Sequence, residues 1–242
     1  MKCFNELMKF HFVIFMKTNK IVMPVLLWIV FMGTAYSTMP LEIVSSFIVS
    51  LFFLYILMTC ISLSYTDSVD VISEQVLIFK VGNENRYYLS KVTFLIILGT
   101  IASLIGILFP LMKDIILDNR LFSRAITIQD LGCAFILHVS AAILGIVTGM
   151  LFQPRIIKDR KKALLYTGLF VVMAMVKIQL VKEFSIAKFI AWIFPPLADI
   201  TNLFSGKKYF YFEDITKAII YVGVYSIVVI IINIYLLRKN KF

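Results

Sequence analysis

The sequence alternates between long apolar runs and short polar segments. An α-helix of about 20 residues covers the roughly 30 Å of a bilayer's hydrocarbon core, so apolar runs near this length predict transmembrane helices. Six runs qualify, at residues 21–39, 41–63, 92–112, 131–152, 163–181 and 215–237. Too little polar sequence remains for a separate soluble domain. We therefore expect an all-α membrane protein, with one transmembrane domain over residues 1–242 and six transmembrane helices.

The first twenty residues have a different pattern. Apolar side chains recur every three or four positions and most charges lie elsewhere on the helical wheel, which predicts an amphipathic interfacial helix over residues 1–20. The apolar run itself begins only near residue 21, so we expect this start not to be cleaved as a signal peptide.

The segment 182–214, before the last run, contains an apolar piece that is too short to cross a membrane. Pro195 and Pro196 close this piece, and it carries Trp192, a residue type enriched at the membrane interface. The pattern predicts an outer re-entrant segment that enters the membrane part way and turns back.

Residues 65–91 form the longest well-mixed polar stretch between two apolar runs. Asp67, Asp70 and Glu74 recur at three- and four-residue spacing, which predicts that the acids share one face of a short helix. Gly82 should end that helix. A solvated loop and a docking surface for a partner are both open interpretations of this stretch.

Composition and charge place the chain in a membrane and indicate its orientation. Hydrophobic residues make up 61% and charged residues 16%, whereas soluble domains average about 45–50% and about 25%. The net charge of +10 comes from Lys and Arg clustered between apolar runs, which favours anionic lipid rather than nucleic acid as the partner. Most of these cations lie in residues 1–20, 65–91 and 153–162 and after residue 237, so we expect both termini to be cytoplasmic.

No pattern of catalytic residues is present. The sequence has neither HExxH nor GxSxG nor a phosphate-binding loop, so we expect no enzyme activity, cofactor or metal site in this chain. His138 lies in the fourth run without an acidic partner at helical spacing, which favours a hydrogen-bonded core imidazole over a functional one. Cys3, Cys60 and Cys133 are too far apart to indicate disulfides or a metal cluster.

Small residues in the fourth run indicate close helix packing. Ala141, Gly145 and Gly149 form a small-xxx-small row, and such rows let two helices approach closely in a membrane. The row could join two copies of the chain, or it could seat a neighbouring helix of the same copy. The third run carries a weaker version of the pattern.

The order of these parts resembles the type-2 ABC transporter permeases over the full length. Glu74, Gly82, Arg86 and Lys91 are similar to that family's loop pattern of an acid, a glycine turn, a basic residue and a lysine that opens the third span. The proline pair in the outer re-entrant segment is similar as well. The small size resembles permeases that export amphipathic peptides or confer immunity to antimicrobial peptides, such as the phenol-soluble-modulin exporters.

This resemblance implies a homodimer or heterodimer of permeases in a bacterial cell membrane, with two cytoplasmic ABC ATPase subunits that bind ATP and Mg. Charged and apolar side chains of the 65–91 loop would orient and hold it in a groove of the ATPase. The coupling residues expected on this basis are Asp70, Val71, Glu74, Phe79, Gly82, Arg86 and Lys91. The direction of transport and the identity of the substrate stay open. The main alternative is a non-transporting immunity or scaffold protein that binds a partner through the same loop.

Overall fold

The computed structural model describes residues 2–153 and 155–239, with the backbone alone at positions 2, 3 and 71. The described chain is mainly helical, and its one isolated β-bridge joins Leu41 to Phe122. The helices are α1 (Lys2–Lys17), α2 (Val22–Ala35), α3 (Ile43–Thr66), α4 (Val71–Val81), α5 (Glu84–Ile116), α6 (Ile128–Leu151), α7 (Arg160–Glu183), α8 (Ala187–Ala191), α9 (Leu197–Asn202) and α10 (Phe212–Lys239).

Five helices, α3, α5, α6, α7 and α10, are long and apolar enough to cross a membrane. The first expected span is shorter than its apolar run, because α2 has 14 residues and covers about 21 Å. It meets the same criterion only together with α1, across a bend of 78°. An all-α membrane protein is therefore confirmed, with five candidate spans, or six if the bent pair counts as one.

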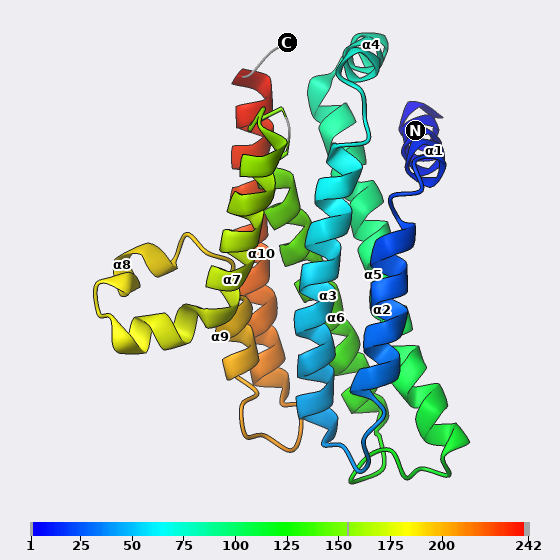
Figure 1. Ribbon diagram of the computed structural model, residues 1–242, viewed down its shortest axis with the longest axis vertical. Helices are drawn as coiled ribbons and strands as arrows, with labels where there is room; N and C mark the ends of the chain where they lie inside the picture. The colour runs from blue at the N-terminus through cyan, green and yellow to red at the C-terminus, as the bar shows by residue number, and fades with distance from the viewer. Residues whose placement is uncertain (1, 154, 240–242) are drawn as a thin grey trace.

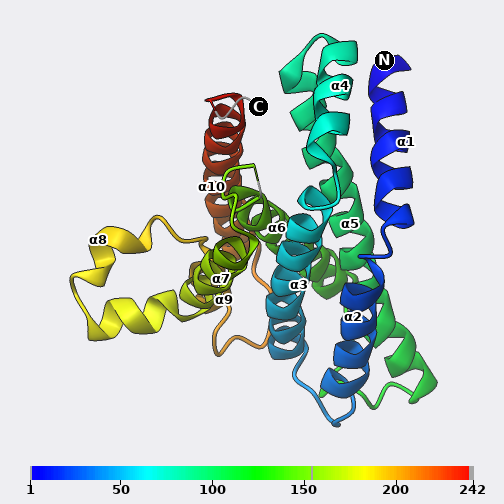
Figure 2. The same cartoon turned by 45° about the horizontal axis from the view of Figure 1, so that its top comes forward.

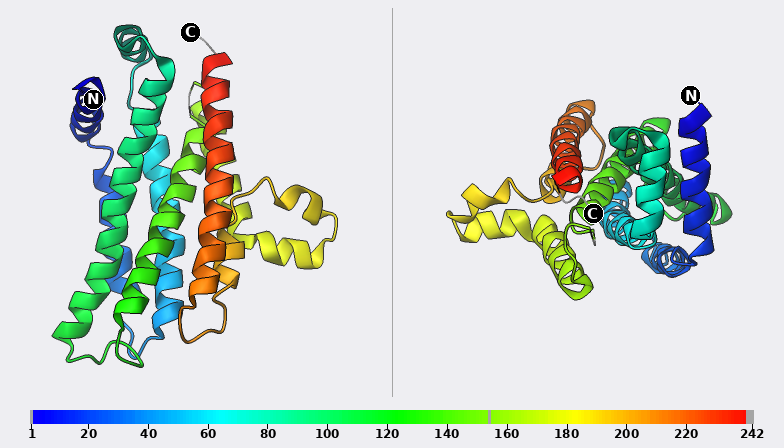
Figure 3. Two further views of the ribbon diagram at one scale, coloured as in Figure 1. Left: turned by 180° about the vertical axis from the view of Figure 1, so that it is seen from behind. Right: turned by 90° about the horizontal axis from the view of Figure 1, so that it is seen from above.

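Helix α6 lies at the centre of the bundle and packs against α3, α5 and α10 (Figure 3). In its most apolar stretch 67% of the residues are buried, against 11% for α7 at the edge. Most of the buried apolar side chains belong to one continuous core around α3, α5 and α6. The helices at the edge keep broad apolar surfaces exposed, as expected of helices that face lipid.

The small-residue row of α6 is what allows its close contact with α3. A Cβ atom added to Gly145 would lie 2.5 Å from the carbonyl oxygen of Tyr55, and one added to Gly149 would lie 2.5 Å from that of Thr59. Ala141, in the same row, is buried. The prediction that this row joins two copies of the chain is therefore wrong, because α3 of the same chain already occupies it. The alternative of packing within one chain is confirmed.

The two ends of the bundle differ. Helices α1 and α4 and the C-terminal end of α10 gather at one end, while the loops 36–42 and 117–127 lie at the other (Figure 1). Helix α1 lies beside α4 and crosses the start of α5 (Figure 2), and Leu7 of α1 packs in one small apolar cluster with Leu77 of α4 and Leu237 of α10.

At the end of the bundle that carries the 36–42 and 117–127 loops, Arg124 makes several stabilising contacts. Arg124 donates to both carboxylate oxygens of Asp130, at 2.6 and 2.8 Å, and its guanidinium lies 4.3 Å from the centre of the Tyr209 ring. Hydrogen bonding to Asp130 raises the pKa of Arg124 above its usual value. Thr127 and Asp130 form a capping box at the start of α6. These contacts tie the 117–127 loop to the segment before α10.

The C-terminal end of α7 and the whole of α8 project sideways from the bundle (Figures 1 and 3). The apolar piece before the prolines contains a helix of five residues, α8, and a second short helix, α9, begins after Pro195 and Pro196. Pro196 is the N-cap residue of α9. Trp192 follows α8 and is 74% exposed. The prolines thus divide this segment into two short helices.

Candidate functional site

The polar stretch after α3 folds into α4, which is capped at both ends. Asp70 accepts a hydrogen bond from the Ser73 backbone N–H at 3.2 Å and is the N-cap. Gly82 ends the helix with a φ of 66°, a left-handed conformation that glycine adopts without strain. Asn83 then caps α5 by accepting from the backbone N–H of Arg86. The predicted helix end at Gly82 is confirmed.

The prediction that three acids share one face of this helix is wrong. Helix α3 continues to Thr66, so Asp67 is its C-cap, where it pairs with Lys20 at 3.1 Å and Arg160 at 3.2 Å. Asp70 precedes α4 in an extended conformation. Of the three acids Glu74 alone lies within α4. The prediction from spacing failed because Asp67 and Asp70 lie in the break between α3 and α4.

Glu74 points from α4 into the protein and is 6% exposed. Its Oε2 lies 3.5 Å from Nη1 of Arg155, and its Oε1 lies 3.7 Å from Nζ of Lys91. Lys91 is 1% exposed. A buried charge without a partner would cost several kcal/mol, so the opposite charges stabilise each other here. The three side chains connect α4, α5 and the loop between α6 and α7.

Tyrosines surround this ion cluster. Arg155 donates to the hydroxyl of Tyr88 at 2.8 Å, and Nζ of Lys91 lies 5.8 Å from the centre of the Tyr65 ring, within range of a cation–π contact. Oε1 of Glu74 and the hydroxyl of Tyr87 are buried with no hydrogen-bond partner among the described residues. In this cluster one carboxylate therefore faces two cations, and the hydrogen bonding is incomplete.

His11 connects α1 to the same cluster. Its side chain is fully buried, with Nε2 2.8 Å from Oγ of Ser90 and Nδ1 hydrogen-bonded to the hydroxyl of Tyr65. Ser90 donates its own proton to the carbonyl oxygen of Tyr87 at 2.7 Å, so its oxygen accepts from His11 Nε2. Nδ1 then accepts from Tyr65. Helix α1 is thereby fixed to the ends of α3 and α5.

A second polar chain runs from the cluster to α10. Nζ of Lys91 donates to Oε1 of Gln153 at 3.5 Å, and Nε2 of Gln153 donates to Oδ1 of Asn233 at 3.2 Å. Asn233 donates in turn to the carbonyl oxygen of Met150 at 2.7 Å. The side chains of Gln153 and Asn233 are both 2% exposed. Buried contacts therefore link α4 through α5 and the end of α6 to the last helix.

The opposite face of α4 is apolar and exposed. Phe79 is 91% exposed, Ile72 69% and Val76 52%. Arg86, at the start of α5, is exposed as well. Clustered exposed apolar side chains indicate contact with a partner or a membrane. The side chain of Val71 lies outside the described residues.

The coupling residues predicted from the sequence thus have three different positions. Phe79 and Arg86 are exposed, and Asp70 and Gly82 shape the ends of α4. Glu74 and Lys91 are buried, so assigning them to the contact surface itself is wrong. Lys91 also lies well inside α5, which begins at Glu84.

Sequence reasoning missed the polar partners of the cluster, which are His11, Tyr65, Gln153, Arg155 and Asn233. Asn233 offered a usable signal, because a polar amide within an apolar run needs a partner in a membrane. His138 is as predicted a hydrogen-bonded core residue, 2.8 Å from Oγ of Ser50 and 2.7 Å from the carbonyl oxygen of Ala134.

The described residues contain no group of three or more His, Cys, Asp or Glu side chains that could hold a metal ion. The comparisons with known proteins found no matching family model, no matching curated protein and no matching solved structure.

Proposed function

We propose that this chain is the membrane subunit of an ATP-driven transporter of the type-2 ABC class, and that α4 receives movement from a cytoplasmic ATPase. The observation that carries the proposal is the two-sided character of α4. Glu74 holds one face in a buried ion cluster, while Phe79 on the other face is almost fully exposed. A solvated loop would explain neither feature, whereas a helix that docks on a partner and is anchored to the bundle would use both.

The buried polar chain supports a route for the movement. A displacement of α4 would act through Glu74 on Lys91 of α5, and from there through Gln153 on Asn233 of α10. The transport step is then a change in packing among rigid helices.

The remaining assignments belong to the same proposal. The positive segments favour cytoplasmic termini, which puts α4 on the side where an ATPase would meet it. The resemblance to the permease family implies a bacterial cell membrane. Helix α1 would be the interfacial helix, and α8 with α9 the outer re-entrant segment. Two permease copies would work with two ATPase subunits, which would bind ATP and Mg. This chain would not itself be an enzyme.

An amphiphile suits this membrane subunit better than a sugar as the exported substrate. The candidate spans carry mostly apolar and aromatic side chains. Burying an unpaired hydroxyl among such side chains costs about 1–3 kcal/mol in proteins. A sugar with several hydroxyl groups would lose too many hydrogen bonds to water. Amphipathic peptides and lipid-like molecules are therefore the proposed substrates.

The test is whether an ATPase is held through Phe79. Full-length tagged protein is purified from its own membranes in dodecyl maltoside, and Mg-dependent ATP hydrolysis is measured in the eluate. Phe79→Ala should lower the retained ATPase at least tenfold, since central aromatic residues of an interface often contribute 2 kcal/mol or more. Phe212→Ala is the matched control, because Phe212 is 69% exposed at the other end of the bundle.

Two outcomes would contradict the proposal. Wild-type ATPase retention with Phe79→Ala and with Phe79→Asp would remove α4 from the contact. A stable complex that contains no ATP-hydrolysing partner would favour the non-transporting scaffold or immunity protein.

A further inference from the structure

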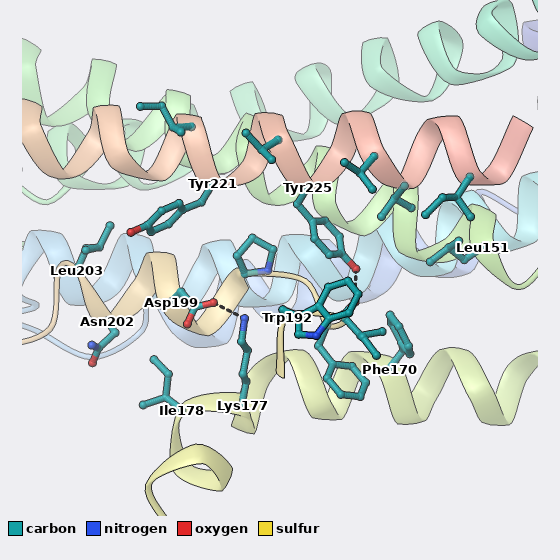
Figure 4. A pocket seen from close by; sticks show the side chains of 18 residues that line it. Leu151, Phe170, Lys177, Ile178, Trp192, Asp199, Asn202, Leu203, Tyr221 and Tyr225 are labelled. Atoms are coloured by element: carbon teal, nitrogen blue, oxygen red, sulfur yellow. Dashed lines mark hydrogen bonds and ion pairs between the residues drawn. The ribbon is translucent and has the colours of Figure 1, made fainter. Parts of the chain in front are cut away.

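A large cavity opens between α7, the α8–α9 segment and α10 (Figure 4). Its volume of about 1110 Å³ slightly exceeds the roughly 300–1,000 Å³ of typical ligand pockets. The hydroxyl of Tyr225 donates to the carbonyl oxygen of Ile193 at 2.9 Å and so ties α10 to the segment that closes one side. The ion cluster beneath α4 is not part of this cavity.

The cavity has a polar end and an apolar end. Lys177, Asp199, Asn202 and Tyr221 gather near α9, while Leu151 lies far from them toward the other end (Figure 4). Apart from the polar group, the lining is mostly apolar and includes aliphatic side chains of α10 together with aromatic ones: Phe170, Phe194, Val224, Val228 and Ile232. A ligand that fills the cavity must therefore have a polar head and an apolar tail.

The ion pair at the polar end keeps bonding capacity on both partners. Nζ of Lys177 donates to Oδ2 of Asp199, which uses one of three ammonium donors. Among the described residues neither side chain has another hydrogen-bond partner. The side chain of Lys177 is 12% exposed and that of Asp199 34%. A head group with one positive and one negative charge could therefore pair with both without separating them.

We propose that this cavity binds a single-chain amphiphile with a zwitterionic head group, its head at Lys177 and Asp199 and its chain along α10. A whole amphipathic peptide is too large, because a helix about 10 Å across would fill about 1110 Å³ with about nine residues. Calling this ligand a transported substrate rests on the proposed function, whereas its binding does not.

Trp192 is a reporter for this binding, because it lines the cavity and is 74% exposed. The other tryptophan, Trp28, is 3% exposed and does not line it. The full-length protein is placed in nanodiscs of phosphatidylglycerol and titrated with lysophosphatidylcholine brominated in mid-chain, which quenches tryptophan on contact. We expect saturable quenching, and we expect Trp192→Phe to abolish the saturable part.

Two variants separate the tail site from the general lipid surface. Val224→Phe narrows the cavity and should weaken binding about tenfold, as expected for overpacking worth about 1.4 kcal/mol. Val172→Phe is the control, since Val172 is 55% exposed on α7 and does not line the cavity. Equal quenching by both variants, linear in added lipid, would overturn the proposal and leave ordinary lipid contact.

The head site is tested with Lys177→Gln combined with Asp199→Asn, which keeps the shape and removes both charges. The double variant should bind lysophosphatidylcholine about tenfold more weakly and brominated monoacylglycerol unchanged, since only the zwitterion loses a hydrogen bond from Lys177 to its phosphate and the attraction of its ammonium to Asp199. Equal affinities of wild type and double variant for lysophosphatidylcholine would overturn the head assignment. None of these titrations involves the ATPase, so failure here is distinguishable from failure of the proposed function.

Discussion

Replacing Glu74 with glutamine should loosen α4 from the bundle. The change removes the anion that faces Lys91 and Arg155, at 3.7 and 3.5 Å, and leaves a lysine that is 1% exposed without its opposite charge. Breaking a buried ion pair from one side costs about 3–5 kcal/mol. These distances exceed the roughly 2.7–2.9 Å of strong charged hydrogen bonds, so we expect the lower value, about 3 kcal/mol.

The matched control is Glu6→Gln. Glu6 pairs with Lys9 at 3.0 Å, which is shorter than either distance to Glu74, but its side chain is 71% exposed. An exposed pair contributes at most about 1 kcal/mol and often nothing measurable. Burial and not distance should therefore decide which of the two substitutions destabilises the protein.

Thermal unfolding of the purified protein in dodecyl maltoside measures the difference. A loss of 1 kcal/mol lowers Tm by about 2–4 °C in a protein of this size, so Glu74→Gln should lower Tm by about 6–12 °C and Glu6→Gln by less than about 4 °C. Hydrogen exchange should rise in α4 (Val71–Val81) and stay unchanged in the centre of α6. Adding Lys91→Met should restore part of the loss, because it removes the charge that Glu74→Gln leaves unpaired.

The reasoning would be refuted by equal Tm values for Glu74→Gln and Glu6→Gln. It would also fail if Glu74→Gln combined with Lys91→Met were no more stable than Glu74→Gln alone, since the buried lysine would then not be the source of the loss.

Three further predictions follow from the packing and the orientation. Gly145→Ala should lower Tm because its Cβ meets backbone, whereas Gly168→Ala, with no atom within 4 Å, should leave Tm unchanged or raise it slightly; equal effects would contradict the assigned packing of α6 on α3. With the native cysteines replaced, an impermeant maleimide on intact cells should label Lys208→Cys and not Lys158→Cys, and the reverse would invert the orientation. Asn233→Leu removes a donor to a buried carbonyl and a partner of Gln153; it should cost about 1–3 kcal/mol and reduce substrate-stimulated ATP hydrolysis while the ATPase stays bound, and unchanged stimulation would remove α10 from the route.

Much of the architecture follows from local sequence, because the signals act over a few residues. Apolar run length predicts which segments are long enough to cross a bilayer, and it located all five candidate spans. Gly82 ends α4 because glycine adopts the left-handed conformation without strain. Spacing alone was misleading at Asp67 and Asp70. A helical-wheel argument assumes one continuous helix, whereas α3 ends at Thr66 and α4 begins only at Val71.

The direction in which a side chain points was decided by tertiary structure. Glu74 could face a partner or the protein interior, and the choice depends on Lys91 and Arg155, which the chain brings beneath α4 from two other elements. The small-residue row likewise does not specify which helix packs against it. Helix α3 occupies it because the fold places α3 against α6.

The polar chain from Lys91 to α10 could not be predicted from a local sequence pattern, because it joins residues that are far apart in the sequence. Gln153 and Asn233 are 80 positions apart, and His11 and Ser90 are 79 apart. Periodicity reports which face of one helix is apolar. It carries no information on which helix covers that face, so contacts between distant residues emerge only once the helices have packed.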